Sequence, residues 1–67
     1  MNILAERIKE LRIDRGLSQR DLAKAIGCTQ PAVARWESNL QIPNAVIIKN
    51  IAVYFGVSSD YLLGLED

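Results

Sequence analysis

The chain has 67 residues with eight basic and eight acidic side chains, so its formal net charge at neutral pH is zero. A hydrophobic content of 49% with 24% charged residues is typical of one small globular domain and excludes a disordered tail. The absence of histidine and the single cysteine exclude an internal disulfide and the usual zinc sites, and they make an enzyme the least favoured class.

Apolar residues recur at spacings of three and four, which predicts helices and gives no support to strands. The apolar stripe of a first helix consists of Leu4, Ile8 and Leu11. This helix ends near Gly16, where glycine suits a left-handed cap. Ser18 begins a second helix, because Ser18 and Asp21 have the spacing of a capping box, and Gly27 ends it after about two turns.

A third helix begins after Thr29 and extends to about Ser38. Pro31 is tolerated in its first turn, because an N–H at that position has no partner within the helix. Asn39 then tolerates the left-handed conformation with which the chain leaves this helix.

A fourth helix opens at residues 43–44 and closes at Gly56. Its buried face consists of Ile47, Ile48, Ile51, Ala52 and Phe55. Ser58 caps a short fifth helix. The predicted fold class is therefore all-α, with five short helices forming one compact domain over residues 1–67.

Residues 19–38 contain the most informative pattern, since two short helices joined by a tight turn are the layout of a helix-turn-helix. Ala23 is small enough for the following helix to pack closely across it, and Gly27 accepts the positive φ of the turn. Val33 and Trp36, three residues apart, are expected to anchor the third helix inward. We expect Trp36 to belong to the core and not to stack on bases.

The opposite face of the third helix is formed by Gln30, Pro31, Ala34 and Arg35. Such a face suits entry into a DNA major groove about 12 Å wide. Gln30 has the donor and acceptor that pair with adenine, and Arg35 has the donors that pair with guanine or a phosphate. Pro31 and Ala34 offer apolar contact to thymine methyl groups.

At this point the sequence resembles the lambda-repressor and Cro-type, or XRE-type, helix-turn-helix domains. The stretches that carry the resemblance are RIKELRIDRGLSQRDLAKAIGCTQPAVARWES, then Pro43, then IAVYFGVSSDYLLG. The resemblance implies a five-helix, lambda-repressor-like fold, an operator-binding homodimer and a role in transcription, often repression. It also implies that Arg12 and Glu37 form a structural ion pair. Its base-reading positions correspond to Gln30, Pro31 and Arg35.

The resemblance places Gln19 on a DNA phosphate at the start of the second helix. Two residues depart from the family pattern: Pro31 replaces a residue that is usually polar, and Asn39 stands where glycine is usual. Further phosphate contacts are expected from Arg20, Lys24 and Thr29. For Arg20 and Lys24 an ordinary solvated charge is an equal alternative.

Apolar residues near the C-terminus exceed the evident needs of so small a core; they are Val53, Val57, Tyr61, Leu62 and Leu65. Together with the resemblance, they predict a two-fold dimer interface formed by Val57, Tyr61, Leu62 and Leu65. The alternative is that they complete the core. A two-fold dimer would place its recognition helices about 34 Å apart on two half-sites.

Cys28 is expected to be a small buried apolar residue and not a redox sensor. No apolar stretch approaches the ~18 residues of a membrane span, so we expect a cytoplasmic protein without membrane, metal or cofactor. The eight basic residues all lie within residues 1–49, whereas three acids, Asp60, Glu66 and Asp67, end the chain. The zero net charge keeps a second function open, a protein-interaction module of the same fold such as an antitoxin or adaptor.

Overall fold

The computed structural model describes residues 3–66, and Asp67 of the predicted acidic tail lies outside this range. The described residues form five helices and no strand: α1 (Ile3–Asp14), α2 (Gln19–Ile26), α3 (Gln30–Glu37), α4 (Ala45–Phe55) and α5 (Ser59–Leu62). The all-α class and the order of the five predicted helices are therefore confirmed. Within residues 3–66, no helix is both long enough and apolar enough to cross a membrane.

The helix ends are set by local capping, as the sequence predicts. The Ser18 hydroxyl accepts the Asp21 N–H, and the Asp21 carboxylate accepts the Ser18 N–H, each at 3.0 Å. Gly27 ends α2 with φ 76°, in the left-handed region that suits glycine. The same kind of side-chain cap opens the other helices that follow a turn, at Thr29, Asn44 and Ser58. These residues therefore end one helix and begin the next, which keeps the helices short.

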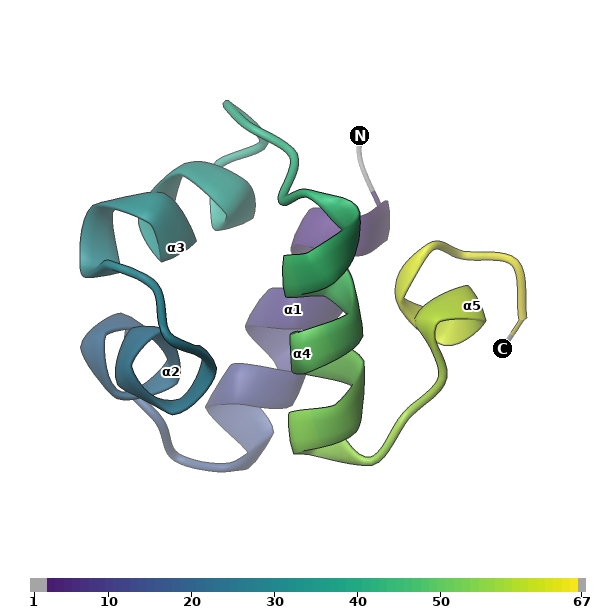
Figure 1. The fold of residues 1–67 in the computed structure, drawn as a ribbon, viewed down its shortest axis with the longest axis horizontal. Coiled ribbons are helices and arrows are strands. Elements are labelled where there is room, and N and C mark those ends of the chain that lie inside the picture. Colours follow the sequence, from purple (N-terminus) through teal and green to yellow (C-terminus); the bar gives the residue numbers. More distant parts are fainter. Residues whose placement is uncertain (1–2, 67) are drawn as a thin grey trace.

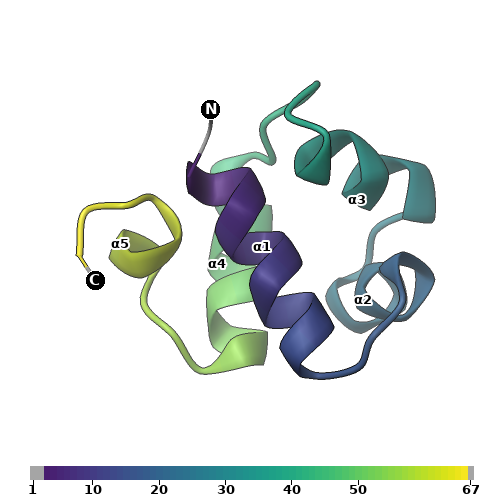
Figure 2. The same cartoon turned by 180° about the vertical axis from the view of Figure 1, so that it is seen from behind.

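Two sides of the molecule are separated by α1 and α4 (Figures 1 and 2). The pair α2 and α3 lies on one side and α5 lies on the other. Helix α3 packs on α2 and α1, α2 also packs on α4, and α5 packs on both α1 and α4. The helix-turn-helix is therefore one side of a single core and not an appendage to it.

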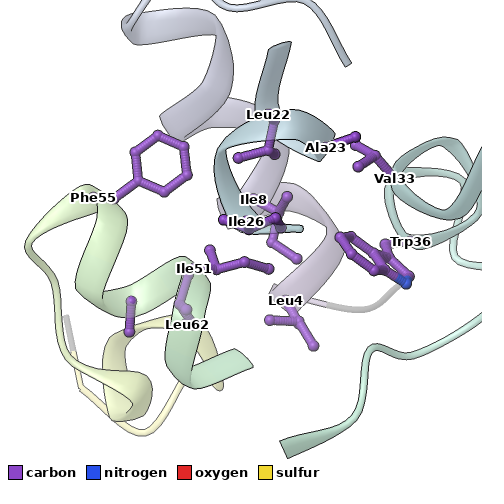
Figure 3. Packing of buried hydrophobic residues seen from close by; sticks show 11 residues of the cluster. Leu4, Ile8, Leu22, Ala23, Ile26, Val33, Trp36, Ile51, Phe55 and Leu62 are labelled. Atoms are coloured by element: carbon purple, nitrogen blue, oxygen red, sulfur yellow. The ribbon is translucent and has the colours of Figure 1, made fainter. Parts of the chain in front are cut away.

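Each of the five helices contributes one completely buried large side chain to this core (Figure 3). These side chains are Ile8, Leu22, Val33, Ile51 and Leu62. Trp36 and Phe55 are buried beside them, as predicted. Full burial of an aliphatic side chain contributes about 1.5–3 kcal/mol, so all five helices depend on this shared cluster.

The prediction that Leu62 belongs to a dimer interface is wrong. Its side chain is 0% exposed, because α5 directs it into the core and not outward. Cys28 is only half-buried, and it packs against the core with a thiol pKa raised by desolvation.

Arg7 fastens α5 and the segment after it to α1. Its guanidinium lies 4.1 Å from the centroid of the Tyr61 ring and donates to the backbone carbonyls of Tyr61 and Glu66. The Glu66 carboxylate is also hydrogen-bonded to the Ser58 hydroxyl. The short helix α5 is thus held in place both by burial of Leu62 in the core and by the hydrogen bonds and cation–π contact of Arg7 at the surface.

The connection between α3 and α4 folds back onto the end of α3. Asn39 has φ 63°, the left-handed conformation expected of it. Beyond this residue, the Leu40 and Gln41 N–H groups both donate to the Arg35 carbonyl, at 2.9 and 3.3 Å. The chain therefore returns to the last turn of α3 before α4 begins.

Candidate nucleic-acid interface

Helix α3 presents two different faces. Val33 is fully buried and Trp36 is 5% exposed, so this face is part of the core. Pro31 and Arg35 are exposed on the other face, where Gln30 and Ala34 are half-buried. The inward packing of α3 therefore places the side chains of Gln30 and Arg35 at the molecular surface, as the recognition helix of a DNA-binding domain requires.

A chain of hydrogen bonds joins Gln30 to the start of α2 and to the end of α3. Gln30 donates from Nε2 to Oε1 of Gln19 at 2.8 Å, and Gln19 donates from Nε2 to Oε1 of Glu37 at 3.2 Å. A primary amide has two N–H donors and one acceptor oxygen. The bond to Gln19 uses one donor, so the other donor and the oxygen of Gln30 retain the capacity to bind a ligand.

Arg12 and Glu37 form a bidentate ion pair at the end of this chain of hydrogen bonds. Arg12 Nε and Nη2 donate to the two Glu37 oxygens at 2.7 and 2.9 Å, and Nη1 donates to the Leu17 carbonyl at 2.8 Å. The two side chains are only 13% and 4% exposed. The hydrogen bond to Glu37 raises the pKa of Arg12. The pair therefore ties α1 to α3, and Gln19 extends the connection to α2.

A surface hollow lies at the N-terminus of α2, and its lining residues are Arg12, Ser18, Gln19, Arg20 and Gln30. Arg20 is exposed there and supplies a positive charge. The N-terminus of a helix adds partial positive charge through its backbone N–H groups. The hollow is therefore suited to an anion such as a phosphate, directly beside the Gln30 amide.

Two further residues predicted to contact phosphate, Thr29 and Lys24, do not line this hollow. Thr29 is exposed at the N-terminus of α3, where its hydroxyl oxygen accepts the Ala32 N–H at 3.4 Å and keeps its own proton to donate. Lys24 is exposed one turn after Arg20 but does not line the hollow. Its charge instead helps to lower the pKa of Asp21, which the capping hydrogen bonds with Ser18 lower most.

Arg35 lies apart from this hollow and has a partner that the sequence did not identify. Its Nε donates to Oε1 of Gln41 at 2.9 Å. The turn at Asn39 was predictable and brings the chain back to α3, but the pairing of two exposed side chains leaves no periodic signal in the sequence.

The remaining residues of the predicted dimer patch differ in exposure. Leu65 is 74% exposed, whereas Val57 is half-buried and Tyr61 is half-buried beneath the Arg7 guanidinium. Other large apolar side chains are exposed on the α3–α4 connection and on α4, at Leu40, Ile42, Val46 and Val53.

Comparison with known proteins points to one family. The sequence model described as helix-turn-helix matches residues 8–62. The HTH-type transcriptional activator BcrR of Enterococcus faecalis is 34% identical over 62 residues, which are 92% of this chain and 30% of BcrR. The uncharacterized HTH-type transcriptional regulator YqaE of Bacillus subtilis is 33% identical over 91% of this chain and 53% of that protein. The chain spans 30% to 56% of the length of the curated relatives it matches.

Solved structures agree with this assignment. The P22 c2 repressor in complex with synthetic operator 9T superimposes with a TM-score of 0.90 at 27% identity, over 98% of this chain and 100% of that chain. PlcR of Bacillus thuringiensis, in complex with the peptide PapR7 and DNA, gives a TM-score of 0.81 at 32% identity, over 92% of this chain and 22% of that chain. The present chain therefore belongs to the helix-turn-helix family, with the lambda-repressor-like fold of DNA-binding transcription regulators and not that of an enzyme.

Proposed function

We propose that this chain binds double-stranded DNA sequence-specifically as a homodimer, with α3 in the major groove, and represses transcription by occupying a two-fold operator. The observation that carries the proposal is the division of α3, on which Val33 and Trp36 are buried while Gln30 and Arg35 reach the surface. The likeness to the P22 c2 repressor in its operator complex supports this assignment.

In this proposal Gln30 and Arg35 select bases. Gln30 retains a donor and an acceptor beyond its bond to Gln19, which is the pair that an adenine edge requires. Arg35 is exposed and charged, with donors that match O6 and N7 of guanine. Pro31 and Ala34 lie between these positions in the sequence of α3 and supply apolar contact to thymine methyl groups.

Phosphates bind at the hollow beside these side chains. Gln19, Arg20 and the first N–H groups of α2 hold one phosphate there, and Thr29 donates to another from the start of α3. Lys24 adds a longer-range attraction from α2. The zero net charge of the chain does not oppose this, because the acids Asp60 and Glu66 lie on and after α5, on the far side of α1 and α4 (Figure 1).

The two-fold contact is formed by apolar residues near the C-terminus. Its members are Leu65, which is exposed, and Val57 and Tyr61, which are half-buried. Two recognition helices related in this way read half-sites about one helical turn apart.

Selection of bound sites from a random DNA pool tests the proposal, using the wild type, Gln30→Ala, Arg35→Ala and the double variant. The wild type should enrich a two-fold site, and each single variant should relax the preference at its own base pair by about 1–3 kcal/mol. Lys49→Ala, which removes an exposed charge from α4, is the control and should retain the wild-type preference. Unchanged specificity in the double variant would show that α3 does not read the bases.

A protein-interaction module remains the second candidate, because large apolar side chains are exposed on the α3–α4 connection, with Leu40 at 78% and Ile42 at 65%. An antitoxin or adaptor would bind a protein at such a surface. Recovery of a stoichiometric protein partner, together with failure to enrich any DNA site, would favour this candidate over an operator-binding repressor.

A further inference from the structure

We infer that Gln41 is a positioning residue for base recognition, which holds the Arg35 guanidinium in the orientation that reads a guanine. The inference rests on the proposed function of α3. Its structural basis is the hydrogen bond from Arg35 Nε to Gln41 Oε1 at 2.9 Å.

The backbone fixes Gln41 relative to the residue that it orients. Asn39 turns the chain with φ 63°, and the Leu40 and Gln41 N–H groups then both bind the carbonyl of Arg35. Gln41 is therefore tied to Arg35 twice, once through the main chain and once through the side chain. An Nε–H bond to a group anchored in this way restricts rotation of the guanidinium plane.

The geometry of the guanidinium makes this restriction useful. The group is planar and has five N–H donors in a rigid fork, of which Gln41 uses the single one on Nε. The two terminal nitrogens remain, and a pair of donors is what N7 and O6 of guanine accept. A free arginine side chain must lose rotamer freedom on binding, whereas one already held at Nε loses less.

The chemistry of the partner is equally important. The Gln41 amide is neutral, so it orients Arg35 without neutralising the charge that attracts DNA. An acid at this position would pair with Arg35 and would also repel the phosphate backbone. Gln41 and Arg35 are both exposed, so the pair lies at the surface that α3 presents.

The first test needs no DNA. Gln41→Met keeps the length of the side chain but removes the amide oxygen, and Gln41→Glu retains an acceptor. By NMR, the Arg35 Nε–H should exchange with water several-fold faster in Gln41→Met than in the wild type, and no faster than in the wild type in Gln41→Glu. Leu40→Ala, at the adjacent exposed residue, is the control and should not alter this exchange. Equal exchange rates in Gln41→Met and the wild type would overturn the inference.

The second test measures binding to the selected operator and to its single-base-pair variants. Arg35→Ala first identifies the base pair that Arg35 reads. At that base pair, Gln41→Met should lower the preference by about three- to tenfold, while the preferences elsewhere and the salt dependence stay unchanged. Gln41→Glu should restore the preference at that base pair, although its affinity should be lower because its charge repels phosphate.

The outcomes separate the positioning role from the proposed function. If Arg35→Ala relaxes one base pair and Gln41→Met does not, the positioning role is overturned and base reading by Arg35 stands. If Arg35→Ala relaxes no base pair, base reading by Arg35 fails, and the role of Gln41 fails with it. A loss spread over all positions with an unchanged salt slope would show that Gln41 contacts a phosphate directly. A salt slope reduced by about one would show that Gln41 holds Arg35 on a phosphate and not on a base. Either result would overturn the inference.

Discussion

The side chain of Gln30, in the first turn of α3, donates from Nε2 to Oε1 of Gln19, in the first turn of α2, at 2.8 Å. Gln19 donates in turn to Glu37, which is held by Arg12. The proposed base-reading amide is therefore supported by α1, α2 and α3 together. A supported side chain enters a complex with less loss of freedom than an unsupported one, and support of this kind sharpens recognition.

This relationship predicts that Gln19 and Gln30 act as a unit in DNA binding. Gln19→Ala and Gln30→Ala should each weaken operator binding by about 1–3 kcal/mol. The loss of binding free energy in the double variant should be about 1 kcal/mol smaller than the sum of the two single losses, because each single change already breaks the hydrogen bond between Gln19 and Gln30. Titration of the operator with each variant measures this coupling.

The combination of Gln19→Ala with Arg35→Ala is the control, because Arg35 bonds to Gln41 and not to Gln19. Those two losses should add to within about 0.5 kcal/mol. Strict additivity for Gln19 and Gln30 would mean that the bond between them contributes nothing to recognition.

The Arg12–Glu37 pair predicts a large loss of stability when one partner is removed. Both side chains are largely shielded from water, so Glu37→Gln leaves the Arg12 charge with weaker compensation. We expect Glu37→Gln and Arg12→Met each to lower the free energy of unfolding by about 3 kcal/mol, measured by denaturant titration. Replacing both residues together by methionine should cost clearly less than the two single losses combined. Single losses below about 0.5 kcal/mol would show that the pair behaves as an exposed one.

The capping box at the start of α2 predicts an acid-dependent stability. Hydrogen bonds from the Ser18 backbone and side chain lower the pKa of Asp21 below its ordinary value of 3.8. A carboxylate with a lowered folded pKa stabilises the fold above its unfolded pKa and loses this effect as the pH falls through the folded value. The advantage of the wild type over Asp21→Asn should therefore be complete at neutral pH and should be lost as the pH falls through the lowered pKa of Asp21.

Denaturant unfolding of both proteins at neutral and at acidic pH measures this difference. Thr29→Ala serves as the control, because it removes a cap that has no titratable group. Its cost should be about the same at both pH values. A difference between wild type and Asp21→Asn that persists unchanged in acid would contradict the role of the ionised carboxylate.

Two leucines near the C-terminus predict opposite effects. Leu62 is fully buried and Leu65 is 74% exposed. Leu62→Ala should lower the free energy of unfolding by about 2–5 kcal/mol, since it leaves a cavity in the shared core. Leu65→Ala should change the stability of the monomer by less than about 0.5 kcal/mol and yet weaken the proposed dimer about tenfold. Sedimentation over a range of concentrations measures the second effect, and an unaltered dimer in Leu65→Ala would place the interface elsewhere.

Local signals made most of the fold predictable. Ser18, Thr29, Asn44 and Ser58 begin helices because their side chains bind the backbone three residues ahead, a pattern that is visible in the sequence. Gly27 ends α2 for a reason equally local. The helix boundaries depend on these short-range interactions, so the sequence predicts them without knowledge of the tertiary arrangement.

The direction of side chains on α5 was not predictable in the same way. Leu62 is the last residue of α5 and Leu65 follows the helix, and the choice between core and surface for each depends on how α5 docks on α1 and α4. The hydrogen bond and the cation–π contact between Arg7 and Tyr61 join two residues that are 54 positions apart in the sequence. Likewise, the partner of Arg35 is set by a loop that returns to α3, and residue types alone do not specify it.

The most direct measurement replaces N7 of single purines in the selected operator, using 7-deazaadenine and 7-deazaguanine. If α3 reads the major groove, removal of N7 from one adenine of each half-site should weaken wild-type binding by about tenfold and should leave binding by Gln30→Ala unchanged. Removal of N7 from one guanine should act in the same way on the wild type and have no effect on Arg35→Ala. Equal sensitivity of the wild type and both variants, or no sensitivity at any purine, would contradict base reading by these two side chains.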